Sequence, residues 1–139
     1  MAYPIARVVM PSDLSGGQRR RVAIARTMAY KPRILLYDEP TTGLDPITAL
    51  TVDREIVKLR DFEGVSSILV THQLRDAFFV AEHTAKREDG RVVLERAAGR
   101  KADEAEFIML RDGQIALEGN AAELREASKK DPYIHSFLS

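Results

Sequence analysis

Four consecutive apolar residues, Ile34 to Tyr37, run directly into two carboxylates, Asp38 and Glu39. A short apolar run of this kind is the pattern of a strand that is buried on both faces of a parallel sheet. A second candidate strand, Ser67 to Val70, is followed within two residues by His72. These two runs constrain the chain to an α/β architecture, provided that helices connect and cover the strands.

Helices are predicted on either side of the first strand. Ser15 can accept a hydrogen bond at an N-cap, and Gln18 completes a capping box, so that the pattern predicts a helix over 15–30. Asp45 can cap a second helix whose first turn suits Pro46. The apolar face of the first helix is expected to comprise Val22, Ala25, Met28 and Ala29.

The pattern changes after His72. A helix is predicted from about residue 74 to 81, and two short helices are expected over 121–127 and 132–138. Between them lie two Asp-Gly pairs, Asp89-Gly90 and Asp112-Gly113, each flanked by residues that favour strands. An Asp-Gly pair in that setting predicts a tight hairpin, so two consecutive hairpins are expected.

Composition excludes several classes of protein. The 139 residues carry 21 basic and 21 acidic side chains, so that net charge offers no attraction to nucleic acid or to an anionic bilayer. The absence of cysteine excludes disulfides and thiolate metal sites. The longest apolar run is far shorter than the ~20 residues that span a bilayer. Because residues 1–10 lack the apolar core of a secretory signal, a cytoplasmic location is expected.

Two segments offer groups that suit phosphate chemistry. Phosphates bind at the carboxyl end of strands in open α/β sheets, where Asp38 can hold Mg²⁺ through water and Glu39 can orient or deprotonate a water molecule. Ser15-Gly16-Gly17 opens a helix whose free N–H groups favour an anion. Each feature also has a plain structural explanation: a surface turn, an ordinary helix cap and, for His72, a structural histidine.

The order and spacing of the motifs resemble one family. Leu14-Ser15-Gly16-Gly17-Gln18 resembles the signature loop of ATP-binding cassette (ABC) proteins, and Ile34 to Glu39 resembles their Walker B strand with its catalytic glutamate. Leu44-Asp45 is similar to the D-loop, and His72 to the switch histidine. The fold that this resemblance implies is α/β, part of a P-loop NTPase domain with a parallel sheet, flanking helices and β-hairpins near the carboxyl end.

The resemblance also implies roles for these residues. Glu39 and His72 would be catalytic, and Asp38 would bind Mg²⁺ through water. The nucleotide, ATP, would meet Ser15, Gly16, Gly17, Gln18 and Asp45. Such ATPases act as head-to-tail pairs, so the implied partners are a second ATPase copy and a membrane permease, with no nucleic acid. The implied location is the cytoplasmic face of the inner membrane.

One part of the resemblance is missing. A P-loop needs a Gly-Lys pair, and none occurs in the 139 residues. The backbone N–H groups and the lysine of that loop contribute most of the affinity for triphosphate. We therefore expect the natural protein to extend further upstream, and we expect no measurable ATPase activity from this chain alone.

The sequence further predicts one partial ABC domain over residues 1–139. The family motifs occupy 11–85 and resume at 107–139, and the segment 86–106, in which 12 of 21 residues are charged, is expected to be an inserted, solvated hairpin. The segments 10–13, 41–48 and 131–138 resemble the Mla/Mce-type lipid transporters, which move phospholipids between bacterial membranes and were linked to organic-solvent resistance. A regulatory interaction module and a DNA-associated ABC ATPase are the alternative functions.

Overall fold

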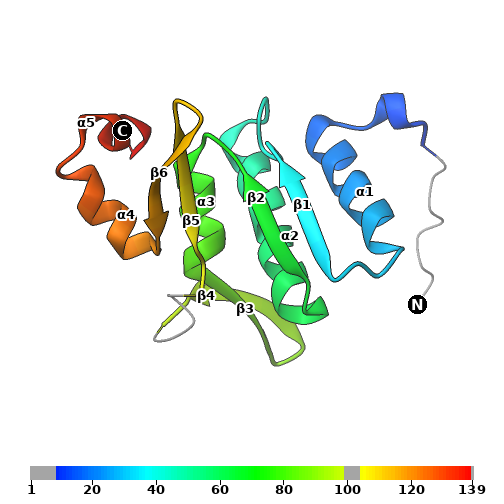
Figure 1. Cartoon of the computed structure of the whole chain (residues 1–139). Coiled ribbons are helices and arrows are strands. Elements are labelled where there is room, and N and C mark those ends of the chain that lie inside the picture. Colours follow the sequence, from blue (N-terminus) through cyan, green and yellow to red (C-terminus); the bar gives the residue numbers. More distant parts are fainter. Residues whose placement is uncertain (1–8, 99–103, 139) are drawn as a thin grey trace.

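The computed structural model describes residues 9–98 and 104–138. The chain alternates helices and strands in its first half and ends in two hairpins and two short helices (Figure 1). In chain order the elements are the 3₁₀-helix η1 (Pro11–Asp13), α1 (Gly16–Met28), β1 (Ile34–Asp38), α2 (Pro46–Glu63), β2 (Ser66–Val70), α3 (Leu74–Glu82), β3 (His83–Glu88), β4 (Arg91–Arg96), β5 (Phe107–Arg111), β6 (Gln114–Gly119), α4 (Ala121–Ser128) and α5 (Pro132–Leu138).

Within the described ranges the strands form three separate pairs. β1 and β2 pair in parallel, with Ile34 opposite Ser66 and Asp38 opposite Val70. The pairs β3–β4 and β5–β6 are antiparallel hairpins. Their turns are the two predicted Asp-Gly pairs, in which both residues have positive φ, the geometry of a type I′ turn. Both hairpins are therefore confirmed at their predicted turns.

The helices begin where the sequence predicts. The Ser15 hydroxyl accepts from the Gln18 N–H at 3.2 Å, and the Gln18 side chain accepts from the Ser15 N–H at 2.8 Å, which completes the capping box. Asp45 caps α2, and Gly64 ends it at a φ of 65°. Of the helices in the described ranges, none has the length and apolar character needed to cross a membrane.

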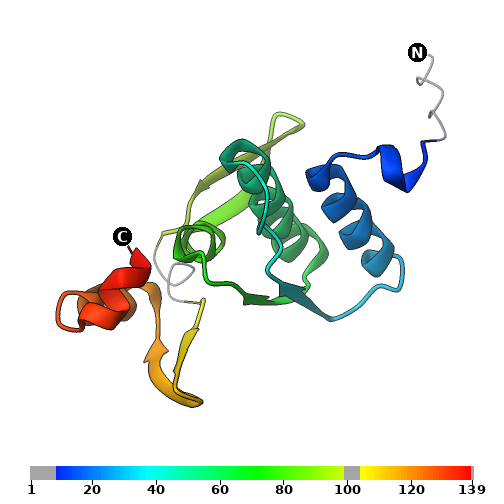
Figure 2. The same ribbon diagram turned by 90° about the horizontal axis from the view of Figure 1, so that it is seen from above.

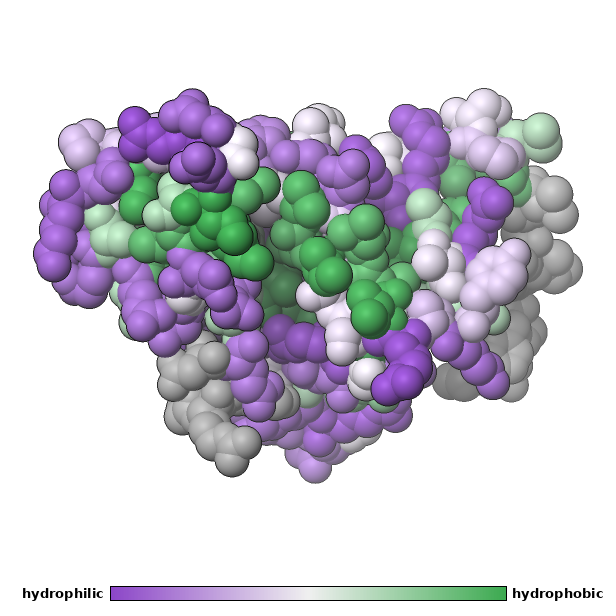
Figure 3. All heavy atoms as spheres, in the orientation of Figure 1, coloured by the Kyte–Doolittle hydropathy of each residue, from purple (hydrophilic) through white to green (hydrophobic). Residues whose placement is uncertain are grey.

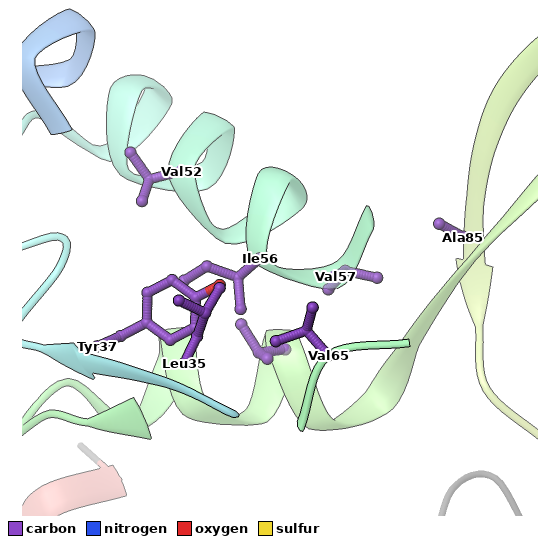
Figure 4. Packing of buried hydrophobic residues seen from close by; sticks show 8 residues of the cluster. Leu35, Tyr37, Val52, Ile56, Val57, Val65 and Ala85 are labelled. Atoms are coloured by element: carbon purple, nitrogen blue, oxygen red, sulfur yellow. The ribbon is translucent and has the colours of Figure 1, made fainter. Parts of the chain in front are cut away.

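The main core lies between β1 and α2. Leu35 and Tyr37 point from the strand toward Val52 and Ile56 of the helix (Figure 4). Val52 and Ile56 are fully buried in this contact. A second buried cluster joins α3 to the carboxyl-terminal elements. Its members are Leu74, Phe78, Ala121, Leu124 and Ile134.

The other face of the β1–β2 pair is open, contrary to the prediction of strands buried on both faces. Burial alternates along β1, and Leu36 is 65% exposed. α2 and α3 lie on one side of the pair (Figure 2), and the opposite side shows a continuous apolar surface (Figure 3). The prediction fails because the described chain supplies helices to only one side. Exposed apolar residues of the two strands are Ile34, Leu36, Ile68 and Val70.

The predicted apolar face of α1 is also wrong in part. Met28 packs against the main core, but its partner there is Ile24. Val22, Ala25 and Ala29 are exposed. Because α1 lies beside the sheet and packs only part of its surface against α2, helical spacing alone could not show which apolar residues face inward.

The first hairpin begins three residues before the predicted charged segment 86–106. The first hairpin starts at His83, and its first residues, Thr84 and Ala85, are buried. Residues 86–93 are exposed, as expected of a solvated hairpin, whereas Leu94 on the return strand packs against the main core. Residues 99–103 of the predicted segment lie outside the described residues.

A carboxylate is enclosed beside the main core. Asp53 of α2 is 1% exposed, and its Oδ1 atom has no hydrogen-bond partner among the described residues. Burial, together with the nearby charge of Asp76, raises the pKa of Asp53 from 3.8 to about 7, against a smaller opposing effect of Arg75. The folded protein therefore keeps this proton at pH values where the unfolded chain has lost it.

This proton makes stability depend on pH. We expect the free energy of unfolding to fall as pH rises from about 4 to about 7, because in this range the unfolded chain has released the Asp53 proton and the folded protein still holds it. Asp53→Asn should remove the fall and make the protein more stable than the wild type at pH 8, by up to about 4 kcal/mol. Urea unfolding at pH 5 and pH 8 measures both effects.

Asp112→Asn is the matched control, because the side chain of Asp112 is 94% exposed at a hairpin turn. It should leave the pH dependence unchanged. A wild-type protein whose stability is flat between pH 4 and pH 8 would contradict the burial of an ionisable Asp53.

Candidate functional site

The carboxyl ends of β1 and β2 form one edge of the molecule. The Glu39 N–H donates to the carbonyl oxygen of Val70 at 2.8 Å, which fixes the residue after β1 against the end of β2. Glu39 has a φ of 45°, in the left-handed region that residues with a side chain rarely adopt. Such strain at a polar strand end is a common mark of a functional site.

The Glu39 carboxylate is held by neighbours from both strand ends. Its Oε1 accepts from the His72 N–H at 3.1 Å and lies 2.7 Å from the His72 Nδ1. Its Oε2 accepts from the Thr42 hydroxyl at 2.8 Å and from Thr71 at 3.4 Å. Partial burial opposes ionisation, but the hydrogen bonds from His72 and Thr42 outweigh it and lower the pKa of Glu39 below 4.5. Glu39 is therefore an ionised carboxylate at neutral pH.

Asp38 is the last residue of β1 and is exposed at the same edge. Among the described residues, no group of three or more histidine or acidic side chains is arranged to hold a metal ion. A single carboxylate still fits Mg²⁺, because this ion keeps several waters and takes its other ligands from substrate phosphates. The Asp38 carboxylate thus suits an ion that arrives with a phosphate ligand.

The segment Ser15–Gln18 lies at the start of α1, in a different place from the strand edge. Gly17 is buried against α2, where an added Cβ would collide with the methyl group of Thr48. A Cβ on Gly16 would lie 3.0 Å from the end of the Leu44 side chain. Both glycines therefore allow the close approach of α1 to the loop and helix that follow β1, a packing requirement that the sequence did not reveal.

A cleft of about 430 Å³ separates α1 from the loop after β1. Its lining includes Gly16, Arg19, Arg20, Thr42 and Leu44. Arg20 crosses the cleft and donates to the carbonyl oxygen of Thr42 at 3.3 Å. Among the described residues, this is the only hydrogen bond between α1 and the loop after β1. It ends at Thr42, whose hydroxyl also binds Glu39.

Asp45 is engaged as a helix cap. Its Oδ1 accepts from the N–H groups of Ile47 at 3.1 Å and Thr48 at 3.0 Å. Hydrogen bonds from Thr48, and then from Ile47, lower the pKa of Asp45. The structure therefore gives this residue the capping role that the sequence predicts.

The structure brings together three of the predicted residues, Asp38, Glu39 and His72, whereas among the described residues no hydrogen bond joins Ser15–Gln18 or Asp45 to them. Sequence reasoning missed the hydroxyls of Thr42 and Thr71, which complete the surroundings of Glu39. Thr71 directly precedes His72 and Thr42 lies three residues after Glu39, so their closeness in sequence was a usable signal. It also missed the buried pair Thr41 and Asp76, for which the sequence carries no local signal because 35 positions separate the two residues.

Known proteins of one family are similar to this chain in sequence. The sequence model of the ABC transporter family matches residues 3–42. The aliphatic sulfonates import ATP-binding protein SsuB of Albidiferax ferrireducens is 40% identical over 104 residues, which is 72% of this chain and 37% of SsuB. The glutamine transport ATP-binding protein GlnQ of Geobacillus stearothermophilus is 46% identical over 88 residues, 61% of this chain and 35% of GlnQ.

A solved structure covers more of the chain. The ATP-binding cassette MJ1267 of an ABC transporter superposes on 93% of this chain and 42% of its own length, with a TM-score of 0.62 and 21% identity. The fold is therefore that of part of an ABC ATPase cassette. In sequence the chain is similar to ATP-binding subunits of ABC transporters, and it spans roughly a third of the length of the relatives it matches.

The two signature glycines should differ in their tolerance of a side chain. Gly17→Ala should lower the free energy of unfolding by about 1–3 kcal/mol, because the new methyl group meets the half-buried side chain of Thr48. Gly16→Ala should change stability by less than about 1 kcal/mol, because the end of Leu44 can move and alanine favours the helix. Urea unfolding of both variants gives the comparison, and equal losses would contradict the packing role of Gly17.

Proposed function

We propose that this chain is the part of an ABC transporter's ATP-hydrolysing subunit that carries the signature segment, the Walker B strand and the switch histidine. The observation that carries the proposal is the ionised Glu39 carboxylate, held at the carboxyl edge of a parallel strand pair by His72. Similarity to SsuB and GlnQ, both named ATP-binding proteins, supports the same conclusion.

In the proposed reaction, Glu39 accepts a proton from the water that attacks the terminal phosphate of ATP. Its lowered pKa keeps it ionised and ready to accept that proton near neutral pH. His72 holds one oxygen of this carboxylate through both its N–H and its ring. The histidine thereby fixes the direction in which Glu39 points, and its exposed ring edge can meet the phosphate.

Asp38 would hold Mg²⁺ through water, and the ion, when bound, would neutralise charge on the phosphates. The exposed Asp38 carboxylate lies at the strand end that phosphates approach in open α/β sheets. Asp45 would contribute as the cap that fixes the start of α2 beside this edge.

The residues Ser15, Gly16, Gly17 and Gln18 would serve a second ATPase copy. They open α1, whose unpaired N–H groups favour an anion, and they lie across the cleft from the Glu39 edge. We propose that they contact the nucleotide of the partner in a head-to-tail pair. The remaining proposed partner is a membrane permease, which would place the protein at the cytoplasmic face of the inner membrane.

The open apolar face of the β1–β2 pair supports the proposal that further polypeptide belongs to this domain. Leu36 and Ile68 are neighbours on that face and are both more than half exposed. Parallel strands are ordinarily covered on both faces. We propose that the part of the cassette that carries the P-loop covers this surface and supplies the N–H groups and lysine that bind the triphosphate.

A chimera tests the proposal. It would join the SsuB residues upstream of the matched region to residues 9–139 of this chain. The chimera should hydrolyse ATP with Mg²⁺, and Glu39→Gln should lower the rate by about 10²- to 10⁴-fold because the proton acceptor is lost. The isolated chain should show no turnover. A steady-state phosphate-release assay measures all three.

Glu63→Gln is the control, because Glu63 is exposed at the far end of α2. It should leave the rate of the chimera unchanged. Turnover by the isolated 139-residue chain that disappears in Glu39→Gln would contradict the requirement for a second part. The role of Glu39 would be contradicted if the chimera hydrolyses ATP and Glu39→Gln does not lower its rate.

The partner role of the signature segment has a separate test. Ser15→Arg in the chimera should block closure of the pair and abolish hydrolysis while leaving Mg-ATP binding in place, since Glu39 and the strand edge are untouched. Gel filtration with the hydrolysis-deficient Glu39→Gln background should show a nucleotide-dependent dimer that Ser15→Arg removes. A monomeric but fully active Ser15→Arg chimera would contradict the head-to-tail proposal.

Two proposals differ in the substrate that the transporter moves. Three short segments resemble Mla/Mce-type transporters and favour phospholipid movement, whereas SsuB and GlnQ are named for sulfonate and glutamine transport and favour a small solute. Vesicles that contain the natural permease and ATPase would decide between them. ATP-dependent transfer of a fluorescent phospholipid supports the first, and uptake of a labelled small solute without lipid transfer supports the second.

A further inference from the structure

A buried hydrogen bond joins the two chain segments that carry Glu39 and His72. The Thr41 hydroxyl, on the loop after β1, donates to the Asp76 Oδ2 at 2.6 Å in the first turn of α3. Thr41 is 1% exposed and Asp76 is 2% exposed. The contact is therefore shielded from water and links residues that are 35 positions apart in sequence.

Each end of this bond lies close to a group that holds Glu39. On the loop side, Thr42 follows Thr41 and donates its hydroxyl to the Glu39 Oε2. On the helix side, Asp76 donates its N–H to the carbonyl oxygen of Gln73, the residue that follows His72. The Thr41–Asp76 bond thus closes a ring of contacts that runs from Glu39 through both segments to His72.

The charged groups around Asp76 favour its role as an acceptor. The Arg75 Nε donates to its Oδ1 at 3.0 Å, which leaves Oδ2 for Thr41. Asp53 of α2 is the acidic group that interacts electrostatically with Asp76, and Arg75 is the basic group that acts on both carboxyls. One carboxylate oxygen of Asp76 therefore binds the Arg75 guanidinium and the other binds the Thr41 hydroxyl. A neutral side chain could not reproduce this arrangement fully.

We propose that Thr41 and Asp76 are positioning residues that fix the loop after β1 against α3, so that the Glu39 carboxylate stays aimed at His72. The consequence for catalysis rests on the proposed function, whereas the positioning itself does not require nucleotide. Neither residue contacts the water or phosphate in the proposed reaction.

Amide hydrogen exchange in the whole 139-residue chain tests the proposal. The His72 N–H donates to Glu39 and reports whether that contact persists, and the Ile56 N–H inside α2 reports global opening. Thr41→Val keeps the shape of the side chain and removes the hydroxyl. It should speed exchange at His72 by about 10- to 100-fold more than at Ile56, because a buried hydrogen bond to a charged acceptor is lost.

Thr41→Ser is the matched rescue, since it keeps the hydroxyl, and exchange at His72 should stay within about 3-fold of the wild type. The ¹⁵N resonance of the His72 Nδ1 gives a second signature. It should shift in Thr41→Val and stay in place in Thr41→Ser. Val65→Ala, which removes buried apolar atoms from the main core, should change exchange at His72 and Ile56 by the same factor, because it lowers global stability and alters neither residue of the bond.

Equal acceleration at His72 and Ile56 in Thr41→Val would overturn the proposal, because the bond would then contribute only to global stability. A Thr41→Ser variant that behaves like Thr41→Val would overturn it as well. If Thr41→Val does not fold, Asp76→Asn is judged by the same ratio. An inactive chimera would count against the proposed function alone, since the exchange experiment contains no nucleotide.

Discussion

The parallel register of β1 and β2 is the constraint on which the candidate site depends. It places Asp38 opposite Val70, so that the chain leaves both strands at the same edge. The Glu39 N–H then continues the ladder to Val70, and His72 arrives two residues after β2. A slip of one residue would turn Leu35 and Tyr37 out of the core and would carry the strand end away from its partner. The apolar contact with α2 therefore fixes the position of the polar site.

The local elements were predictable from the sequence because short-range rules determine them. The capping box at Ser15, the cap at Asp45 and the two Asp-Gly turns each lie within four residues of their partners, and all are present. The grouping of Asp38, Glu39 and His72 was also predictable, since parallel strands end at a common edge. These inferences needed no knowledge of how separate elements pack together.

The remaining features depend on tertiary packing, which the sequence does not encode locally. An apolar run looks the same whether one face or both faces are covered, so the open side of β1–β2 could not be predicted from Ile34 to Tyr37. The same holds for Gly17, whose Cβ-free surface accommodates Thr48. The bond between Thr41 and Asp76 spans 35 positions and joins a loop to a helix. Only the assembled fold identifies either residue as more than a surface threonine or a helical acid.

The hydrogen bonds that the Glu39 carboxylate already accepts determine how it would act as a base. A carboxylate offers about four lone-pair positions on its two oxygens. In this structure Oε1 meets the His72 N–H and ring, and Oε2 meets Thr42 at 2.8 Å and Thr71 at 3.4 Å. A water molecule can bind only where an existing contact gives way. The bond to Thr71 is the longest of the four, and the Thr71 hydroxyl is also held as an acceptor by the Gln73 N–H at 3.0 Å. The Oε2 position beside Thr71 is therefore where an attacking water would displace least, while His72 and Thr42 keep the carboxylate in its orientation.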